Sequence, residues 1–422
     1  MKEGSAARRR LNVVDESHHP AYVVWELTLR CDHACTHCGS RAVNARENEL
    51  STQEALGVVK QLASMKAREV VLIGGEAYLH DGFLDIVRAL TAEKITVIMT
   101  TGGMGVTAEL AVAMKKAGLQ RMSVSIDGLE ATHDRMRAKK GSFAAAMRAL
   151  EAGRAAGITI TANTNFNRLN RGDLEPLYER LLAAGAKSWQ VQITAPLGRA
   201  ADRPGMLLQP WDLLDLLPRI AELKARGLTE GLLIMPGNNL GYFGREEALL
   251  RSQKPDAGDH FRGCVAGKFT MGIESDGAVK GCPSLQTSHY VGGNVRDTPL
   301  REIWDDTPQL AFARVRTVED LWGFCRTCPF AEVCMGGCTF TAHSVLGRPG
   351  NNPYCHFRAS QLAAQGKRER LVAVERAPGL PFDNGRFELV LEDLRAPDPA
   401  ADDLPEDLVR VRRPATTASS SS

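Results

Sequence analysis

The sequence lacks several features that would place it among membrane, secreted or nucleic-acid-binding proteins. None of its apolar runs approaches the length that crosses a bilayer, and the basic stretch 1–10 is not followed by the apolar segment of a secretory signal. The net charge at pH 7 is only +2, too small to attract nucleic acid or an anionic membrane. With 44% hydrophobic and 24% charged residues, the composition is that of an ordinary globular protein. We therefore expect a cytoplasmic protein with neither a membrane nor a nucleic-acid partner.

Cysteine is absent from most of the chain. The ten cysteines form two groups, three between Cys31 and Cys38 and seven between Cys264 and Cys355, with none between the groups. In a reducing compartment, clustered cysteines are metal ligands more often than they are disulfides. The sequence therefore predicts two separate metal-binding regions.

The first group has the spacing C-x3-C-x2-C, formed by Cys31, Cys35 and Cys38 directly after the apolar run 22–27. Three thiolates bind three irons of one [4Fe–4S] cube and leave the fourth iron open to a substrate or cofactor. The alternative is a structural zinc site, in which His33 or His37 would supply the fourth ligand. The loop alone leaves both interpretations open.

A strand–helix unit recurs between residues 21 and 201. The intervening helices repeatedly end at Ala-Gly, and glycine suits the left-handed residue that closes a helix before the next strand. This repetition predicts a parallel α/β sheet with right-handed crossovers, either open or closed into a barrel. The six expected strands are residues 23–27, 70–73, 96–100, 122–126, 159–163 and 189–193.

Polar and glycine-rich turns follow these strands in order. They include Gly74-Gly75-Glu76, residues 100–103, residues 125–128 and residues 163–165. Ligands in parallel α/β folds collect at the carboxyl ends of the strands, so these turns and the cysteine loop are expected to form one site. The glycines near position 103 do not form a phosphate loop, because the Gly-Lys-Ser/Thr ending is absent.

The cysteine loop and the turns together resemble the radical S-adenosylmethionine (SAM) superfamily. The resemblance implies a partial (β/α)6 barrel like a TIM barrel, with a cluster on Cys31, Cys35 and Cys38 that holds SAM on its open iron. It also implies a set of SAM contacts. Gly74, Gly75 and Glu76 would hold the methionyl amine, Ser125 would lie near the carboxylate or ribose, Arg137 would pair with the carboxylate, and His37 would lie against the adenine. Ala77 stands where the family often has proline, which leaves the detailed turn open.

The second group resembles the SPASM domain, an auxiliary-cluster module, over residues 263–358, for which we expect little regular structure. After Cys264 and Cys282 it has the run C-x2-C-x5-C-x3-C and then Cys355. The resemblance assigns auxiliary cluster II to Cys325, Cys328, Cys334 and Cys355, and auxiliary cluster I to Cys264, Cys282 and Cys338. With three cysteines, cluster I has either an open iron or an Asp or His ligand. A pair of zinc sites is the alternative, but seven cysteines divide poorly into two four-cysteine sites.

The remaining segments carry weaker signals. Residues 1–20 are expected to be an N-terminal arm and 202–262 a connector. For residues 359–395 we expect a charged helix running to about Arg376 and one edge strand at 387–391, and for residues 396–422 a disordered tail.

The resemblance implies an oxidoreductase that reductively cleaves SAM to a 5′-deoxyadenosyl radical and abstracts a hydrogen from its substrate. The first hypothesis is a maturase that crosslinks or otherwise oxidises a ribosomally made precursor peptide. The alternatives are an oxidase of a small molecule such as a tetrapyrrole, and an iron–sulfur electron carrier without a substrate. Expected partners are an electron donor such as flavodoxin or ferredoxin and, because only about twenty residues precede the first strand, a separate leader-peptide-binding protein. No pattern identifies the catalytic acid or base, for which Asp127, Glu274 and Tyr78 are candidates.

Overall fold

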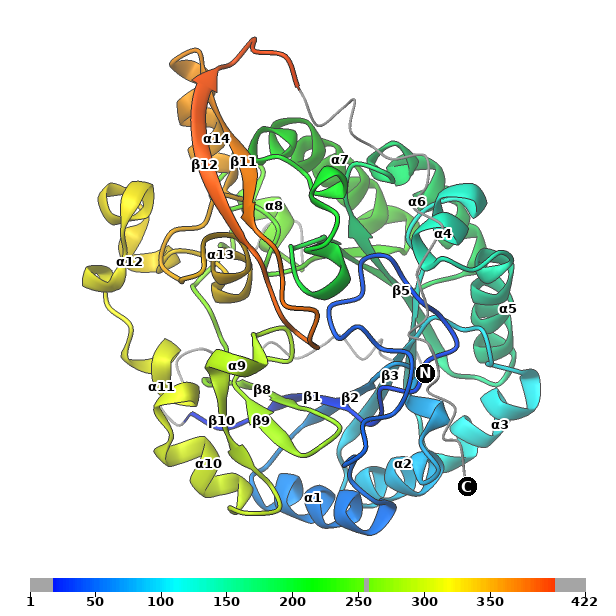
Figure 1. Ribbon diagram of the computed structural model, residues 1–422. Coiled ribbons are helices and arrows are strands. Elements are labelled where there is room, and N and C mark those ends of the chain that lie inside the picture. The colour runs from blue at the N-terminus through cyan, green and yellow to red at the C-terminus, as the bar shows by residue number, and fades with distance from the viewer. Residues whose placement is uncertain (1–17, 254–257, 399–422) are drawn as a thin grey trace, which may run out of the picture.

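The computed structural model describes residues 18–253 and 258–398. A ten-stranded sheet in the order β10-β9-β8-β1-β2-β3-β4-β5-β6-β7 forms its frame. The strands from β8 through β1 to β7 are parallel, and the sheet curves into an unclosed barrel with helices on its outer side (Figure 1). Among the described residues, no helix has both the length and the apolar character needed to cross a membrane.

All six predicted strands are present, with small shifts at their ends. They are β1 (Tyr22–Glu26), β2 (Glu69–Ile73), β3 (Thr96–Thr101), β4 (Arg121–Ser125), β5 (Thr159–Phe166) and β6 (Ser188–Ile193). The helices between them are α1 (Thr52–Ser64), α2 (Phe83–Ala92), α3 (Ala108–Ala117), α4 (Glu130–Arg137), α5 (Ser142–Ala155) and α6 (Leu174–Ala184). Ser51 and Glu54 form the capping box of α1, and Gly118 and Gly185 close α3 and α6 with positive φ.

Successive side chains along each strand point alternately to the core and to the barrel lumen, which we define as the inner side of the curved sheet. Val23 and Trp25 of β1 join the large core between the strands and the helices. Val24 points to the opposite side and packs with Val71 and Ile98 of the neighbouring strands. The lumen therefore has an apolar wall on β1, β2 and β3.

Residues 202–262, expected to be a connector, extend the barrel. Helix α7 (Leu213–Glu230) is followed by β7 (Leu233–Pro236), which pairs in parallel with β6 and ends the sheet. The short helix α8 (Glu247–Arg251) then leads toward the cysteine-rich region. The region thus adds a seventh α/β unit to the six that were predicted.

The cysteine-rich region has more regular structure than predicted. Strand β8 (Thr270–Ile273) pairs in parallel with β1, so this region continues the barrel sheet itself. The other elements are β9 (Ala278–Lys280), α9 (Thr287–Tyr290), β10 (Val291–Asn294), α10 (Leu300–Asp306), α11 (Pro308–Val315), α12 (Ala331–Cys334) and α13 (Thr339–Leu346).

A buried charge network joins the two regions at the seam between β1 and β8. Arg46 contacts Glu26 at 3.2 Å, Glu274 at 2.8 Å and Asp276 at 3.3 Å. Burial raises the pKa of Glu26 to about 7, against the opposing charge of Arg46. The seam is therefore an ionic contact as well as a strand pairing.

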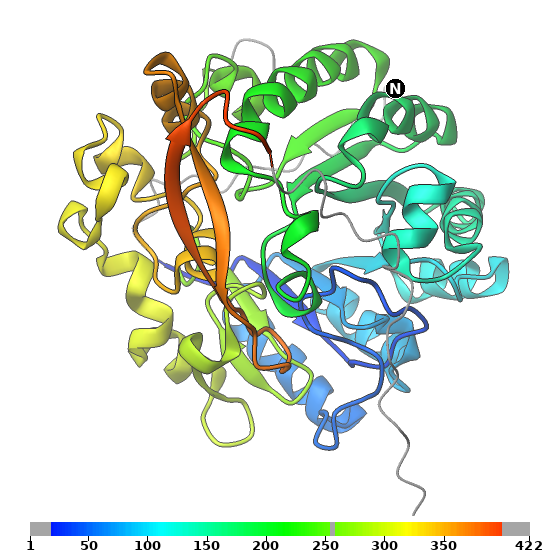
Figure 2. The ribbon, with the colours of Figure 1, turned by 45° about the horizontal axis from the view of Figure 1, so that its top comes forward.

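The predicted long helix after Cys355 is wrong. Helix α14 (His356–Ala364) ends before Gly366, which has a φ of 71°, and β11 (Lys367–Glu375) and β12 (Arg386–Asp393) then form an antiparallel hairpin. Arg368 and Arg370 both pair with Glu392 across the hairpin, so these charges belong to a ribbon. Figure 2 shows the hairpin lying across the mouth of the barrel. Most of the predicted arm and tail lies outside the described residues.

Candidate cluster and cofactor sites

The loop that leaves β1 brings the first three cysteines together. Cys35 is buried, and Cys31 and Cys38 are half-buried. The loop is fixed from outside, because Thr36 donates to the Met136 carbonyl at 2.8 Å and Arg199 donates to the Cys35 carbonyl at 2.6 Å. Burial raises the pKa of the Cys35 thiol to about 11, and burial, the Glu76 carboxylate and the nearby thiols raise the pKa of Cys31 as well. A bound metal would reverse these shifts by favouring the thiolates.

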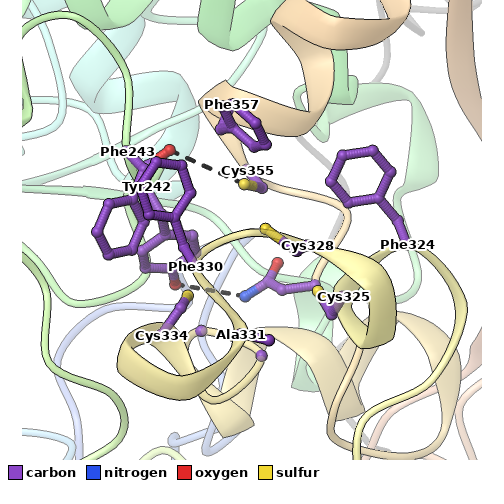
Figure 3. Close-up of a pocket in the computed structure, with 13 residues that line it drawn as sticks. Tyr242, Phe243, Phe324, Cys325, Cys328, Phe330, Ala331, Cys334, Cys355 and Phe357 are labelled. Atoms are coloured by element: carbon purple, nitrogen blue, oxygen red, sulfur yellow. Dashed lines mark hydrogen bonds between the residues drawn. The ribbon is translucent and has the colours of Figure 1, made fainter. Parts of the chain in front are cut away.

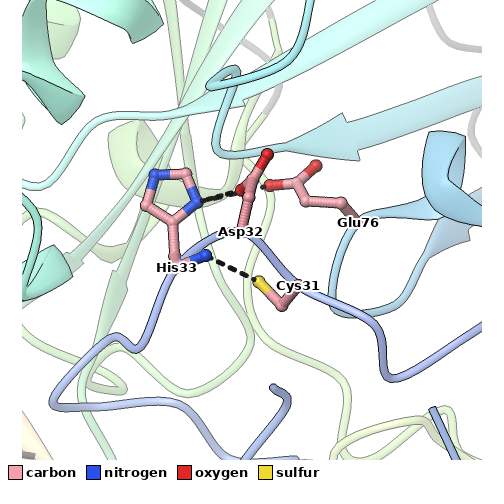
Figure 4. A group of neighbouring side chains, drawn as sticks. All are labelled: Cys31, Asp32, His33 and Glu76. Atoms are coloured by element: carbon pink, nitrogen blue, oxygen red, sulfur yellow. Dashed lines mark hydrogen bonds and ion pairs between the residues drawn. The ribbon is translucent and has the colours of Figure 1, made fainter. Parts of the chain in front are cut away.

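Glu76 reaches the same loop from the end of β2 (Figure 4). It is 2% exposed and accepts hydrogen bonds from Thr101 at 2.5 Å and from the Gly102 amide at 2.6 Å. Burial raises the pKa of Glu76 to about 8 despite these two donors. Its oxygen atoms lie with donor atoms of Cys31, Asp32 and His33 in a group no wider than 4.8 Å. A cationic amine placed there would stabilise the ionised carboxylate.

Gly74 and Gly75 have a packing role that the sequence alone did not indicate. A Cβ atom on Gly74 would lie 2.3 Å from the Thr28 carbonyl oxygen, and one on Gly75 would lie 2.2 Å from the Arg30 carbonyl oxygen. The Gly75 amide donates to Thr28 at 2.7 Å. The two glycines therefore let the turn after β2 lie directly against the loop that leads to Cys31.

Asp127 contacts two of the three remaining predicted SAM contacts, His37 and Arg137. Its Oδ2 lies 2.5 Å from the Arg137 guanidinium and 3.2 Å from His37 Nε2. Burial opposes ionisation of this fully buried carboxyl, yet Arg137 and His37 hold its pKa well below the usual range. Arg137 also donates to the Cys35 sulfur at 3.6 Å, and its Nε has no hydrogen-bond partner among the described residues. The Asp-Gly turn after β4 was the sequence signal for this position, although it did not reveal the role.

Ser125 lies on the lumen side at the end of β4. Asn163 of β5 donates to its hydroxyl at 3.2 Å. The structure thus places all six predicted SAM contacts around the cysteine loop or at the adjoining strand ends.

Four of the later cysteines line one cavity (Figure 3). They are Cys325, Cys328, Cys334 and Cys355, and they are the set that the sequence assigned to auxiliary cluster II. Aromatic rings enclose the cavity, including Phe243 and Phe330, whose rings stack with centroids 4.2 Å apart. A sulfur-lined cavity with apolar walls fits an iron–sulfur cube.

The other three cysteines form a second group. Cys282 and Cys338 each lie within electrostatic range of Cys264. Cys264 and Cys282 also pack with an apolar cluster that contains Ala266 and Leu285. Cys338 also packs against the cluster of Tyr242, Phe261 and Cys355, so it borders both groups, and its assignment to auxiliary cluster I stays a prediction.

Comparison with known proteins identifies both regions. Residues 25–181 match the radical SAM superfamily, and residues 264–329 match the SPASM iron–sulfur cluster-binding domain. The chain is 29% identical over 353 residues to the AdoMet-dependent heme synthase of Methanosarcina barkeri, covering 80% of this chain and 97% of that protein. It is 29% identical over 344 residues to the mycofactocin maturase MftC of Mycobacterium ulcerans, covering 80% and 88%. The structure of Streptococcus suis SuiB bound to SAM matches with a TM-score of 0.62 at 15% identity, covering 80% and 76%.

The chain therefore carries a radical SAM domain over residues 25–181 and a SPASM domain over residues 264–329. It is an enzyme of this class, for which a [4Fe–4S] cluster and SAM are the expected cofactors.

Proposed function

We propose that this enzyme binds three [4Fe–4S] clusters and oxidises a ribosomally made precursor peptide. Cys31, Cys35 and Cys38 would hold the SAM-binding cluster, Cys264, Cys282 and Cys338 auxiliary cluster I, and Cys325, Cys328, Cys334 and Cys355 auxiliary cluster II. The chemistry of the donors supports this assignment, because each set consists of buried or half-buried thiols that line one cavity or act electrostatically on one another.

The residues around the first site would bind and orient SAM. Glu76 would accept the methionyl amine, Arg137 would pair with the carboxylate through its unpartnered Nε, and His37 would lie beside the adenine. When bound, the clusters supply the electron that splits SAM into methionine and a hydrogen-abstracting 5′-deoxyadenosyl radical, and an acceptor for the electron that the substrate loses. Over one turnover the substrate loses one hydrogen atom, found in 5′-deoxyadenosine, and then one proton and one electron. That electron equals the one that splits SAM, so SAM is the net two-electron oxidant and an external donor is needed only to reduce the cluster before the first turnover.

The peptide assignment rests on the polar wall of the lumen, formed by β4, β5 and β6. Its side chains face the lumen, because they alternate along each strand with residues of the core. They belong to Ser123, Ser125, Thr161, Asn163, Asn165, Gln190 and Gln192. They lie side by side, since Asn163 pairs with Ser125 and Gln190 in the strand register, and Asn165 with Gln192. Amides that both donate and accept hydrogen bonds match a peptide backbone. The half-buried state of the Asn and Gln residues leaves them accessible to such a ligand.

The charged groups next to this wall are already paired. Arg121 contacts Glu69 at 3.3 Å, and Arg137, which contacts Asp127 at 2.5 Å, is the residue assigned to the SAM carboxylate. A tetrapyrrole with several carboxylates would require cations without such partners. The second candidate is nevertheless a tetrapyrrole side-chain oxidation, which the relatives named as heme synthases favour.

The substrate test uses reconstituted enzyme, SAM and dithionite. We expect a peptide encoded beside the gene to lose two hydrogens per turnover by mass spectrometry, and its deuterated form to transfer deuterium into 5′-deoxyadenosine. Iron coproporphyrin III is the matched small-molecule substrate. Oxidation of the porphyrin with no change in the peptide would replace the first proposal by the second candidate.

The cluster count gives a separate prediction. Anaerobically reconstituted protein is expected to hold about twelve irons, four for each of three cubes. Iron and sulfide analysis of the purified protein measures this number. About four irons together with tightly bound zinc would contradict the auxiliary-cluster assignment.

A further inference from the structure

The tip of the C-terminal hairpin, residues 376–385, lies against the loop of the first cysteine group. The Phe382 amide donates to the Gly39 carbonyl at 2.9 Å, and Gly39 directly follows Cys38. The Gly198 amide donates to the Asp383 carbonyl at 2.7 Å. Arg41 of the cysteine loop donates from Nε to the Asp383 carboxylate at 3.0 Å. Three hydrogen bonds thus hold the tip, two to the loop that carries Cys38 and one to the segment after β6.

The Phe382 side chain also contacts β9, which is separated from β1 in the sheet by β8 alone. Its ring centroid lies 3.9 Å from Nζ of Lys280, at the end of β9 and two residues before Cys282. Lys280 is fully buried and paired with Glu274 at 2.6 Å. An aromatic face over a desolvated ammonium is a favourable cation–π contact. One residue therefore spans from the first cysteine loop to the segment of Cys282.

The backbone of Phe382 is held in an unusual conformation. Its φ is 55°, a left-handed value that is rare for a bulky side chain. Asp383 stabilises this turn, because its carboxylate also accepts hydrogen bonds from the amides of Gly379 and Leu380. Phe382 is 8% exposed, whereas the neighbouring Leu380 is 63% exposed. Strain of this kind persists where the surroundings impose it, and it occurs often at ligand clamps.

We propose that the hairpin tip is the roof of the reaction chamber, and that Phe382 closes the gap between the SAM-binding cluster and auxiliary cluster I. This inference rests on the cluster assignments of the proposed function, but not on the identity of the substrate. A substrate that gives its hydrogen atom near the first site and its electron near the second must lie below this ring. Phe382 would then both exclude water and limit the size of the substrate group that fits. Neither of the two matched family regions includes the hairpin.

The test compares three variants in the full-length reconstituted protein. Phe382→Asn removes the ring and keeps a residue that tolerates positive φ, Phe382→Tyr keeps the ring, and Leu380→Ala alters the exposed side of the same tip. Two readouts need no substrate. One is the rate at which the chelator bathophenanthroline disulfonate removes iron from the first site, with the variant lacking all three loop cysteines reporting the auxiliary clusters alone. The other is 5′-deoxyadenosine formation with SAM and dithionite only.

For Phe382→Asn we expect both rates to rise about tenfold, measured well below its unfolding midpoint, and the iron content to stay unchanged; the midpoint itself should fall, because a buried ring and its cation–π contact are lost. Phe382→Tyr and Leu380→Ala are expected to match the unaltered protein. Equal rates of iron removal and of 5′-deoxyadenosine formation in Phe382→Asn and Leu380→Ala would contradict the proposal that the tip covers the reaction chamber. If Phe382→Asn does not fold, Asp383→Asn replaces it as the test variant. This change weakens the contact between the tip and Arg41, so the proposal requires faster removal of iron from the first site. Both readouts work without a substrate, so a negative peptide assay would count against the proposed substrate and not against the role of Phe382.

Discussion

Replacing Cys31, Cys35 and Cys38 together by alanine is expected to abolish 5′-deoxyadenosine formation under dithionite. These thiols lie together on the loop after β1, and the other seven cysteines belong to the later region of the chain. Without the three thiolates no cluster can present an open iron beside Glu76 and Arg137. The loss should be complete to the detection limit of the chromatographic assay.

The auxiliary sites provide the control for this variant. Their cysteines are untouched, so the iron–sulfur absorbance should fall by about one third and not disappear. A matched Cys325→Ala/Cys328→Ala variant should show the reverse, with iron lost from the aromatic cavity and SAM cleavage retained. SAM cleavage in the loop variant would show that the active cluster lies elsewhere.

Local patterns in the sequence were sufficient for the first barrel strands and for the four cysteines that line one cavity. The apolar, β-branched runs and the Ala-Gly helix ends act over short distances, and the structure has a strand at each predicted position. The cysteine spacings are also local, and four of the later cysteines line one cavity, whereas the assignment of the other three to one cluster stays a prediction.

Long-range pairing explains most of what the sequence did not reveal. Strand β8 is only four residues long, and it becomes part of the sheet because β1, far away in the chain, offers a free edge. Residues 367–375 contain enough charge to suggest a helix surface, but their partners lie across the hairpin in β12. The left-handed conformation of Phe382 has no local signal, since its neighbours impose it from three separate segments.

Asp127 is the clearest case of a role that only the structure reveals. Its turn predicted a place at the site, but its contacts with His37 and Arg137 arise from a loop and a helix on either side. The carboxyl is fully buried, and it supplies the counter-charge that allows Arg137 to be buried beside Cys35. Asp127 is therefore a positioning residue for two proposed SAM contacts.

Asp127→Ala is expected to lower the free energy of unfolding by about 3–5 kcal/mol, because removing one partner leaves a buried, uncompensated charge. It should also reduce the rate of SAM cleavage by about 100-fold, since Arg137 and His37 lose the group that orients them. Chemical denaturation and the 5′-deoxyadenosine assay measure the two effects.

A double-mutant cycle separates orientation from stability. Asp127→Ala/Arg137→Ala removes both charges, so it should be more stable than Asp127→Ala alone while remaining equally poor at SAM cleavage. Arg121→Ala is the control, because that arginine pairs with Glu69 on the lumen side and contacts no proposed SAM ligand. The control should keep SAM cleavage within a few-fold of the unaltered enzyme. If Asp127→Ala retains its SAM affinity and cleavage rate, the carboxyl has only a structural role, and the assignment of Arg137 and His37 to SAM loses its main geometric support.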